Sequence, residues 1–390
     1  MHPVRMRTVD AAGLKIGDSH PPRIMGVLNV SEESPYDPSV FHEPAEAAEY
    51  VDVELIDEGA DIVDIGLESA NKRFDVLSAE EELQRLDVAA ETIASVSGDA
   101  VFSIETRYHE VAEAALKRGF EMVNDICGFA DPKMPDICTE YDVAVGKMAS
   151  PPDLTSPGAI ADVDHIYDAL TRNGFTEKTI IDPAFGGWSE EKTVAEDRET
   201  FDRLREFRSY GRPMLVSINR KNFLRSIANR STEDALAVSL AATSMAVERG
   251  AHVIRTHDVA ETRDAALIGD RFTPARTYAE SPVTIAELDI DTVKSAERHF
   301  EQMEMIPSTQ RIQTEALTRV FELRDLDDQH VSLLSNAVLG TTARFIPDST
   351  GEHGLLIATQ AGLDAIEANL SADESATSSS LHDIFRTQIC

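Results

Sequence analysis

The sequence is poor in cysteine and lysine, and it contains no long apolar run. Its three cysteines, Cys127, Cys138 and Cys390, are too far apart for a CxxC pair. This spacing argues against a disulfide scaffold or a thiolate zinc site, and it favours a reducing compartment. No segment reaches the ~18 apolar residues of a membrane-spanning helix, and the N-terminus lacks the basic and apolar regions of a secretory signal. We therefore expect a soluble, cytoplasmic protein.

The charge is strongly one-sided. Acidic residues outnumber basic ones by 70 to 36, which gives a formal net charge of −34 and a pI of about 4.6. Long-range repulsion from such a surface disfavours nucleic acids and anionic membranes as partners. The composition fits a halophilic protein, since a salt-rich cell screens this self-repulsion. An ordinary acidic enzyme remains the alternative.

Apolar, β-branched runs alternate with helical patterns eight times in the first two thirds of the chain. The strand candidates are RIMGVLNV, DIVDIGLE, AVFSIET, EMVNDIC, VAVGKM, TIIDPAF, PMLVSIN and HVIRTHD. Near-continuous apolar strands are typical of parallel strands that helices cover on both faces, and eight βα units favour a closed barrel. We therefore predict an α/β fold, a TIM-type (βα)8 barrel at residues 23–279, preceded by an N-terminal segment at residues 1–22.

The rhythm of strands and helices ends after the predicted barrel. Residues 280–390 contain further helical patterns and a Ser-rich stretch, SADESATSSS, which is typical of a mobile linker. We predict a mainly helical, partly flexible C-terminal appendage, whose role the sequence leaves open.

Polar residues stand where the predicted strands end. They are Asn29, Glu68, Glu105, Asn124, Asp182, the run Asn219-Arg220-Lys221, and the pair Arg255 and His257. The carboxyl ends of barrel strands meet at one rim, so this pattern predicts a single pocket there. An amide and a carboxylate such as Asn124 and Asp182 can read the donor and acceptor edge of a flat heterocycle, although both residue types also form turns.

Cations are scarce, so their positions are informative. Only nine of the 36 cations are lysines. Those close to predicted strand ends are Lys72, Arg73, Lys147, Arg220, Lys221 and Arg255. Together they could form a positive patch that localises an anion such as phosphate, or they could pair with acidic residues of the rim. His257 could serve an oxyanion, a proton transfer or only the structure.

Seven motifs in this order resemble dihydropteroate synthase over about residues 22–270. They are MGVLNVSEESPYD, DIVDIGLES with LSAEEELQRL, SIETRYHEVAEAAL, VNDICGF, IIDPAFG, INRKNF and RTHDV. The resemblance implies a barrel-shaped transferase that joins 6-hydroxymethyl-7,8-dihydropterin diphosphate to p-aminobenzoate or a related arylamine. Diphosphate leaves, and the product serves folate biosynthesis.

The resemblance also implies roles for individual residues. Asn124, Asp182 and Lys221 would hold the pterin, with Glu105 beside them. Arg255 and His257 would hold the diphosphate, as would Asn29 through Mg²⁺. The catalytic group expected on this basis is Lys221, Arg255 and His257, and the remaining substrate-binding residues are Glu68, Lys72, Asn219 and Arg220. Small-molecule substrates and a homodimer are the expected partners.

The chain departs from the family mainly on the amine side. Glu105 replaces an Asp, and Asn219 replaces a Ser that meets the aminobenzoate carboxylate. The family's Glu-Ser-Thr-Arg-Pro-Gly loop reads Glu68-Ser69-Ala70-Asn71-Lys72-Arg73 here, and its Met-His motif reads Gly146-Lys147-Met148. Two alternatives stay open: a pterin-dependent methyltransferase, which would need no diphosphate cradle, and a non-catalytic pterin-binding or assembly protein.

Overall fold

The computed structural model describes residues 6–30, 39–41, 43–68, 76–184, 192–274, 276–279, 285–303, 312–372 and 376–386. The chain divides into two compact units, one over residues 5–286 and the other over residues 287–390. None of the helices in these described ranges has the length and apolar character needed to span a bilayer.

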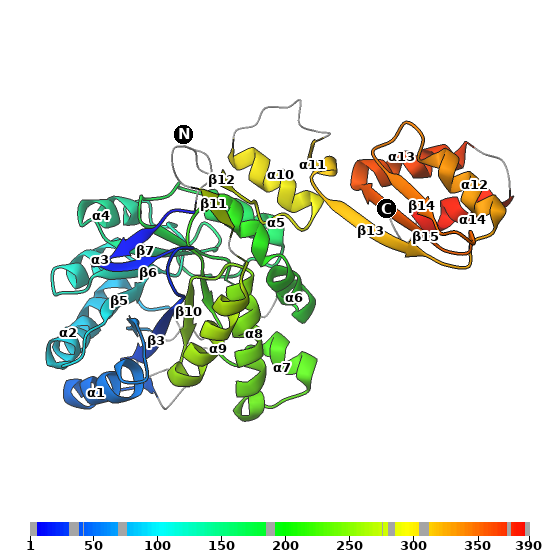
Figure 1. Ribbon diagram of the computed structural model, residues 1–390. Helices are drawn as coiled ribbons and strands as arrows, with labels where there is room; N and C mark the ends of the chain where they lie inside the picture. The colour runs from blue at the N-terminus through cyan, green and yellow to red at the C-terminus, as the bar shows by residue number, and fades with distance from the viewer. Residues whose placement is uncertain are drawn as a thin grey trace. The chain divides into compact units, whose positions relative to one another are not determined.

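An eight-stranded parallel sheet forms the centre of the first unit (Figure 1). Its strands are β3 (Arg23–Asn29), β4 (Ile62–Gly66), β5 (Val101–Thr106), β6 (Met122–Asp125), β7 (Ala144–Met148), β8 (Thr179–Asp182), β9 (Leu215–Ser217) and β10 (Val253–Thr256). They pair in the order β8-β7-β6-β5-β4-β3-β10-β9. A parallel bridge between Ile181 and Met214 joins the two ends of this order, so the sheet closes into a barrel. The predicted TIM-type fold is confirmed.

Helices follow the strands and cover the outside of the barrel (Figure 1). They are α1 (Pro44–Tyr50) with η2 (Val51–Ile56), α2 (Ala79–Ser95), α3 (His109–Leu116), α4 (Met134–Glu140), α5 (Val163–Thr171), α6 (Val194–Asp202) with η3 (Leu204–Tyr210), α7 (Asn222–Ala228), η4 (Glu233–Ala235) with α8 (Leu236–Glu248), and α9 (Val259–Phe272). Local sequence sets their starts. Ser78 and Glu81 form a capping box at α2, which satisfies backbone N–H groups that the first helical turn leaves open.

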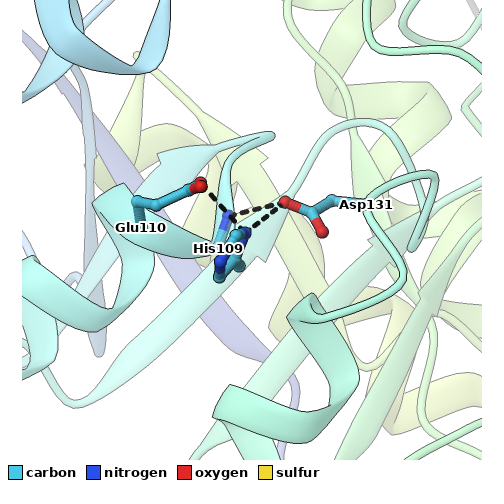
Figure 2. Close-up of side chains that lie close together, drawn as sticks. All are labelled: His109, Glu110 and Asp131. Carbon is cyan, nitrogen blue, oxygen red and sulfur yellow. Dashed lines mark hydrogen bonds and ion pairs between the residues drawn. The ribbon is translucent and has the colours of Figure 1, made fainter.

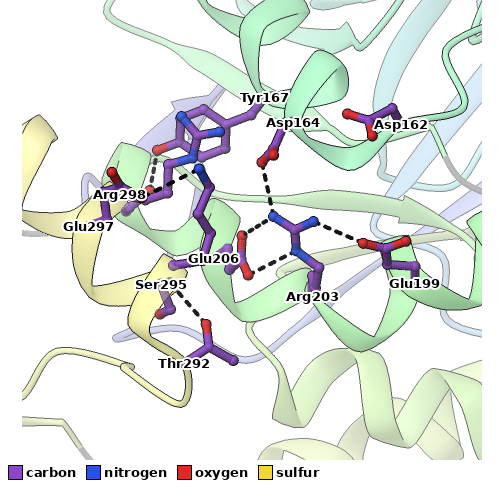
Figure 3. A network of polar contacts seen from close by, with 12 residues as sticks. Asp162, Asp164, Tyr167, Glu199, Arg203, Glu206, Thr292, Ser295, Glu297 and Arg298 are labelled. Carbon is purple, nitrogen blue, oxygen red and sulfur yellow. Dashed lines mark hydrogen bonds and ion pairs between the residues drawn. The ribbon is translucent and has the colours of Figure 1, made fainter. Parts of the chain in front are cut away.

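Ion pairs tie neighbouring outer helices together. Arg203, between α6 and η3, contacts Asp164 of α5 at 3.0 Å, Glu199 of α6 at 3.0 Å and Glu206 of η3 at 2.9 Å (Figure 3). A planar guanidinium can serve several carboxylates at once, so one side chain fixes the packing of three elements.

The inside of the barrel is filled in layers. Each strand contributes one residue to an apolar floor at the amino-terminal end: Met25, Ile62, Val101, Met122, Ala144, Ile180, Leu215 and Val253. The hairpin of β1 (Val9–Ala11) and β2 (Leu14–Ile16) packs against this floor, so part of the expected N-terminal segment belongs to the barrel core.

Side chains alternate along a strand, so the residues two positions beyond the floor also face inward. They are Val27, Asp64, Ser103, Asn124, Gly146, Asp182, Ser217 and Arg255. This second layer is mostly polar and includes four ionisable or amide side chains. The chemistry of the barrel therefore begins one layer above its apolar floor, toward the carboxyl ends of the strands.

The second unit combines helices with a sheet. Its antiparallel sheet has the order β13 (Thr318–Leu323), β15 (Gly354–Thr359), β14 (Arg344–Pro347), and its helices are α10 (Val293–Gln302), α11 (Ile312–Glu315), α12 (Asp328–Ala337), α13 (Gln360–Ser371) and α14 (Ala376–Ile384). Helices were expected, but the sheet was not. The Ser-rich stretch is not simply a linker, since Ser378 lies in α14, where its buried Oγ donates to the carbonyl of Leu370 at 2.7 Å. A small sheet of β11 (Thr277–Ala279) and β12 (Ile285–Ala286) ends the first unit.

Candidate active site

Asp64 of β4 is the centre of the polar layer. Its side chain is fully buried, and Oδ2 accepts hydrogen bonds from Nδ2 of Asn124 at 2.9 Å and from Nε of Arg255 at 2.8 Å. Nη2 of Arg255 also donates to Oε2 of Glu105 at 2.7 Å. Four strands thus bring four interacting side chains to one place. Three of these residues were predicted, and Asp64 was missed.

The sequence did contain a signal for Asp64. The residue interrupts the apolar run Ile62–Gly66, and it stands two positions after the floor residue Ile62. A carboxylate at an inward position of a buried strand needs a hydrogen-bonding partner, which marks it as part of a polar site.

Asp182 of β8 and Lys221 before α7 form the opposite side of the site. Burial raises the pKa of Asp182 to about 6, while the charges of Lys221 and Arg255 oppose this rise. Burial likewise lowers the pKa of Lys221 to about 8, against the pull of Asp182. These three groups act on one another electrostatically, so the predicted carboxylate and cations lie in a common site.

Arg255 remains a cation in this site. Burial would lower its pKa, but Glu105 and Asp64 outweigh that effect and raise it above the ordinary value. Burial raises the pKa of Glu105 to about 7, although Arg255 opposes the rise. The expected positive patch is therefore balanced by carboxylates from the neighbouring strands.

His257 and Asn219 lie at the upper edge of this site, beyond the strand ends. Burial, together with the charges of Arg255 and Lys221, lowers the pKa of His257 to about 3, so its imidazole is neutral near pH 7. Oδ1 of Asn219 is buried and accepts no hydrogen bond from any described residue. His257 can therefore offer hydrogen bonds but not charge, and Asn219 offers an acceptor.

Arg220 has a structural role. Its Nη2 lies 2.7 Å from Oδ1 of Asp258, and its Nη1 donates to the carbonyls of Thr232 and Glu233 at 3.3 and 3.1 Å. These contacts hold the loop between α7 and α8 against the end of β10. The guanidinium is thus paired within the protein. Pairing with acidic residues of the rim, rather than binding an anion, was one of the two interpretations that the sequence left open for the cations.

Asn29 ends β3, and Gly66 of β4 lies between it and Glu105 of β5. Its Nδ2 donates to Oγ of Ser39 at 3.0 Å, which leaves Oδ1 facing the barrel. A Cβ on Gly66 would lie 3.2 Å from Oδ1 of Asn29 and 3.6 Å from Oε1 of Glu105. Two oxygens therefore converge over a glycine where a side chain would block them. Amide and carboxylate oxygens are ligands that suit Mg²⁺, so these residues fit the expected ion chemically.

Lys147 contradicts the expected positive patch. It lies on the outward side of β7 and is fully buried, with Nζ donating to the carbonyls of Arg172 and Gly174. The same ammonium lies over the rings of Phe129 and Phe175. Lys147 therefore binds the carboxyl end of α5 rather than a ligand in the barrel. Lys72 and Arg73 lie outside the described residues.

Glu68 follows β4 and pairs with a residue that sequence reasoning missed. Its Oε2 lies 2.8 Å from Nη2 of Arg107, and both side chains are nearly buried. Its Oε1 accepts the backbone N–H of Leu77 at 3.2 Å. Arg107 directly follows β5. In the sequence it was noted only as part of the motif SIETRYHEVAEAAL, without a role of its own.

Among the described residues, one other cluster has side chains of the metal-binding type. Nδ1 of His109 lies 2.7 Å from Oδ2 of Asp131 and 2.9 Å from Oε2 of Glu110 (Figure 2). The oxygens of Asp131 also accept backbone N–H groups of His109 and Lys133, each at 3.0 Å. The carboxylate therefore joins the loops that follow β5 and β6, and this structural role accounts for the cluster without an ion.

Comparison with known proteins places the barrel in a family. The family model described as pterin binding enzyme matches residues 25–257. A probable bifunctional folylpolyglutamate synthase/dihydropteroate synthase from Haloferax volcanii is 33% identical over 250 residues, which cover 61% of this chain and 29% of that protein. The chain thus spans less than a third of that relative.

Shorter relatives match the barrel almost completely. The dihydropteroate synthase of Escherichia coli K12 is 30% identical over 267 residues, 65% of this chain and 93% of the relative. A Xanthomonas albilineans dihydropteroate synthase, solved with 4-aminobenzoic acid, is 30% identical with a TM-score of 0.56, covering 67% of this chain and 96% of that one. Because the matched region runs from β3 to β10 and contains the whole polar layer, the chain belongs to the family of pterin binding enzymes.

Proposed function

We propose that the chain is a dihydropteroate synthase, which condenses 6-hydroxymethyl-7,8-dihydropterin diphosphate with p-aminobenzoate or a related arylamine in folate biosynthesis. The observation that carries this proposal is the convergence of Asp64, Asn124 and Arg255 at the carboxyl ends of three barrel strands. The relatives that match the whole barrel carry this name, and one of them was solved with 4-aminobenzoic acid.

Unsatisfied acceptors favour a ring that carries N–H groups. Oδ1 of Asp64 and Oδ1 of Asn219 are buried, and neither accepts a hydrogen bond from the described residues. A buried acceptor without a partner costs about 1–3 kcal/mol. A pterin ring presents several N–H donors along one edge, so its binding beside Asp64 would remove this cost there while Asn124 and Asp182 hold the ring's remaining edge.

The cations suit the departure of diphosphate. A bond forms between the amine nitrogen and the pterin methylene carbon, the bond from that carbon to the diphosphate oxygen breaks, and the amine loses a proton. The leaving diphosphate takes the bonding electrons. Arg255 stays protonated, and Lys221 is largely protonated near pH 7, so both can stabilise that negative charge. Neutral His257 can donate a hydrogen bond to the leaving oxygen.

Mg²⁺ is the expected cofactor, with Asn29 as its protein ligand. The inward Oδ1 of Asn29 and the oxygen of Glu105 over Gly66 support this assignment. The ion would neutralise further charge on the diphosphate.

A second copy of the chain is the expected protein partner. The outward side of α8 carries Ala237, Ala241 and Met245, and Glu248 is the one charged residue in this helix. On α9, Ile268 and Phe272 are 57% and 75% exposed. An apolar surface in a molecule of charge −34 is where two copies can meet without bringing many carboxylates together. We place this homodimer in the cytoplasm, in keeping with the two described free cysteines.

A coupling assay tests the reaction. The protein would be incubated in high salt with the pterin diphosphate, Mg²⁺ and a panel of arylamines, and diphosphate and coupled product would be measured together. We expect one diphosphate for each product, loss of both with Arg255→Gln, and full activity with Lys147→Met. Pterin binding without any diphosphate release would instead favour the methyltransferase or the non-catalytic alternative.

A further inference from the structure

The last residue of β5, Thr106, and the two residues after it each contact a different segment around the site. Oγ1 of Thr106 donates to Oε2 of Glu82 in α2 at 2.6 Å. Arg107 pairs with Glu68, and the hydroxyl of Tyr108 donates to the carbonyl of Leu77 at 2.6 Å. The end of β5 thus fixes both Glu68, where the chain leaves β4, and Leu77, where it approaches α2.

Arg107 connects a further loop to this point. Its Nη1 donates to the carbonyl of Leu154, in the loop between β7 and α5, at 2.7 Å. The side chain is only 1% exposed, and its Nε has no acceptor among the described residues. A buried guanidinium with two fixed partners is rigid, and its planar shape lets it serve both partners at once. One residue therefore joins three of the loops that surround the carboxyl ends of the strands.

The position of Glu68 indicates which part of the site these loops border. In β4, Asp64 lies in the polar layer and Gly66 lies beside Asn29 and Glu105. Glu68 follows Gly66 by two residues, just beyond the end of β4 and farther along the chain from the barrel floor. A pterin held by the polar layer would fill the lower part of the site. The second substrate must then approach from the level of Glu68.

We propose that Arg107 is a positioning residue that shapes the arylamine side of the site by fixing Glu68 and the loop at Leu154. This inference rests on the proposed function. It assigns to Arg107 an indirect control of arylamine binding, exerted through Glu68 and the loop at Leu154. The hydrogen bonds of the Arg107 side chain go to Glu68 and Leu154, and none goes to a described residue of the polar layer. Its replacement should therefore separate amine recognition from pterin recognition.

The test uses the full chain and compares Arg107→Met with Arg107→Lys. Met keeps the volume and removes the charge and both hydrogen bonds, whereas Lys keeps the charge but cannot serve two partners in one plane. We expect the KM for p-aminobenzoate to rise at least tenfold in Arg107→Met and less in Arg107→Lys. The Kd for the pterin diphosphate, measured by calorimetry without amine, should stay within twofold of the unaltered protein.

Arg203→Met is the matched control, since Arg203 is also a partly buried, ion-paired arginine but lies on the outside of the barrel. It should leave the amine KM unchanged. If Arg107→Met fails to fold, Glu68→Gln removes the charged partner with a smaller change and should raise the same KM. An unchanged amine KM, or an equal loss of pterin binding, would overturn the positioning role. No diphosphate release by the unaltered protein would overturn the proposed function and this inference with it.

Discussion

Asp64 shows how one buried carboxylate organises a site. It accepts from an amide and a guanidinium on two other strands, so it sets the orientation of both groups before any ligand arrives. A buried charge is tolerated when it is paired and hydrogen bonded, and the removal of one partner costs more than the pair itself contributes. The residue is therefore expected to govern pterin affinity indirectly, through Asn124 and Arg255.

Asp64→Asn should weaken binding of the pterin diphosphate by about 10- to 100-fold, or ~1.4–2.7 kcal/mol. The side-chain amide is almost the same size as the carboxylate, but it removes the negative charge that faces Arg255. It also places its own N–H₂ group against the N–H₂ group of Asn124. Calorimetry without amine measures the effect. Asp61→Asn is the control, because Asp61 pairs with Arg23 at the amino end of the barrel. Equal affinity in the two variants would contradict the role given to Asp64.

At the scale of the element, β7 shows that the alternation of side chains along a strand decides whether a residue faces the pocket or the helices. Its floor residue is Ala144, so Gly146 faces inward and Lys147 faces the helices. There the ammonium meets the carbonyls of Arg172 and Gly174, just past the carboxyl end of α5, where a cation is favourable. Burial nevertheless lowers the pKa of Lys147 to about 7, from an ordinary value of 10.5.

This pKa predicts how stability depends on pH. Between pH 7 and 10.5 the unfolded chain keeps a proton on Lys147 that the folded chain has released, so the free energy of unfolding should rise with pH, at most by about 1.4 kcal/mol per unit. Lys147→Met should lose this rise while pterin binding stays unchanged. Urea unfolding at pH 7 and pH 9 measures it. Lys178→Met is the control, since Lys178 is a partly exposed lysine whose Nζ pairs with Asp142 at 2.9 Å. The same pH dependence in Lys147→Met and the unaltered protein would disprove the assignment.

At the scale of the whole molecule, charge limits where copies can associate. With a net charge of −34, contact between two copies is repulsive over most of the surface unless salt screens it. Helices α8 and α9 pack closely, since a Cβ on Gly269 would lie 2.5 Å from the carbonyl of Ser244. Met245 and Ile268 stand next in sequence to Ser244 and Gly269, and both are exposed, at 45% and 57%.

The double variant Met245→Arg and Ile268→Arg should convert the proposed dimer to a monomer, because each copy would then bury two unpaired cations in the proposed contact. Light scattering coupled to gel filtration in high salt measures the mass. Ile227→Arg is the control, since Ile227 is 65% exposed on α7, away from this pair. A dimer that persists in the double variant would place the contact elsewhere.

Much of the fold and part of the site could be read from the sequence. The eight apolar runs determined the strands, because a strand buried on both faces must be apolar along its length. The residues at their ends, such as Asn124, Asp182 and Arg255, could be named because parallel strands deliver their carboxyl ends to one rim. The short strands of the second unit were not predicted, since β13 exposes alternate residues, β14 exposes three of its four, and neither carries a strong apolar pattern.

The partners of those residues depended on tertiary structure. Asp64 and Lys147 lie in similar apolar runs, yet one faces the pocket and the other the helices, and the register of the barrel decides which. The pairs Arg107 with Glu68 and Arg220 with Asp258 join residues 39 and 38 positions apart. Local sequence specifies a strand or a helix because its signals act over a few residues. Which charges neutralise each other is settled when strands distant in the chain close into a barrel.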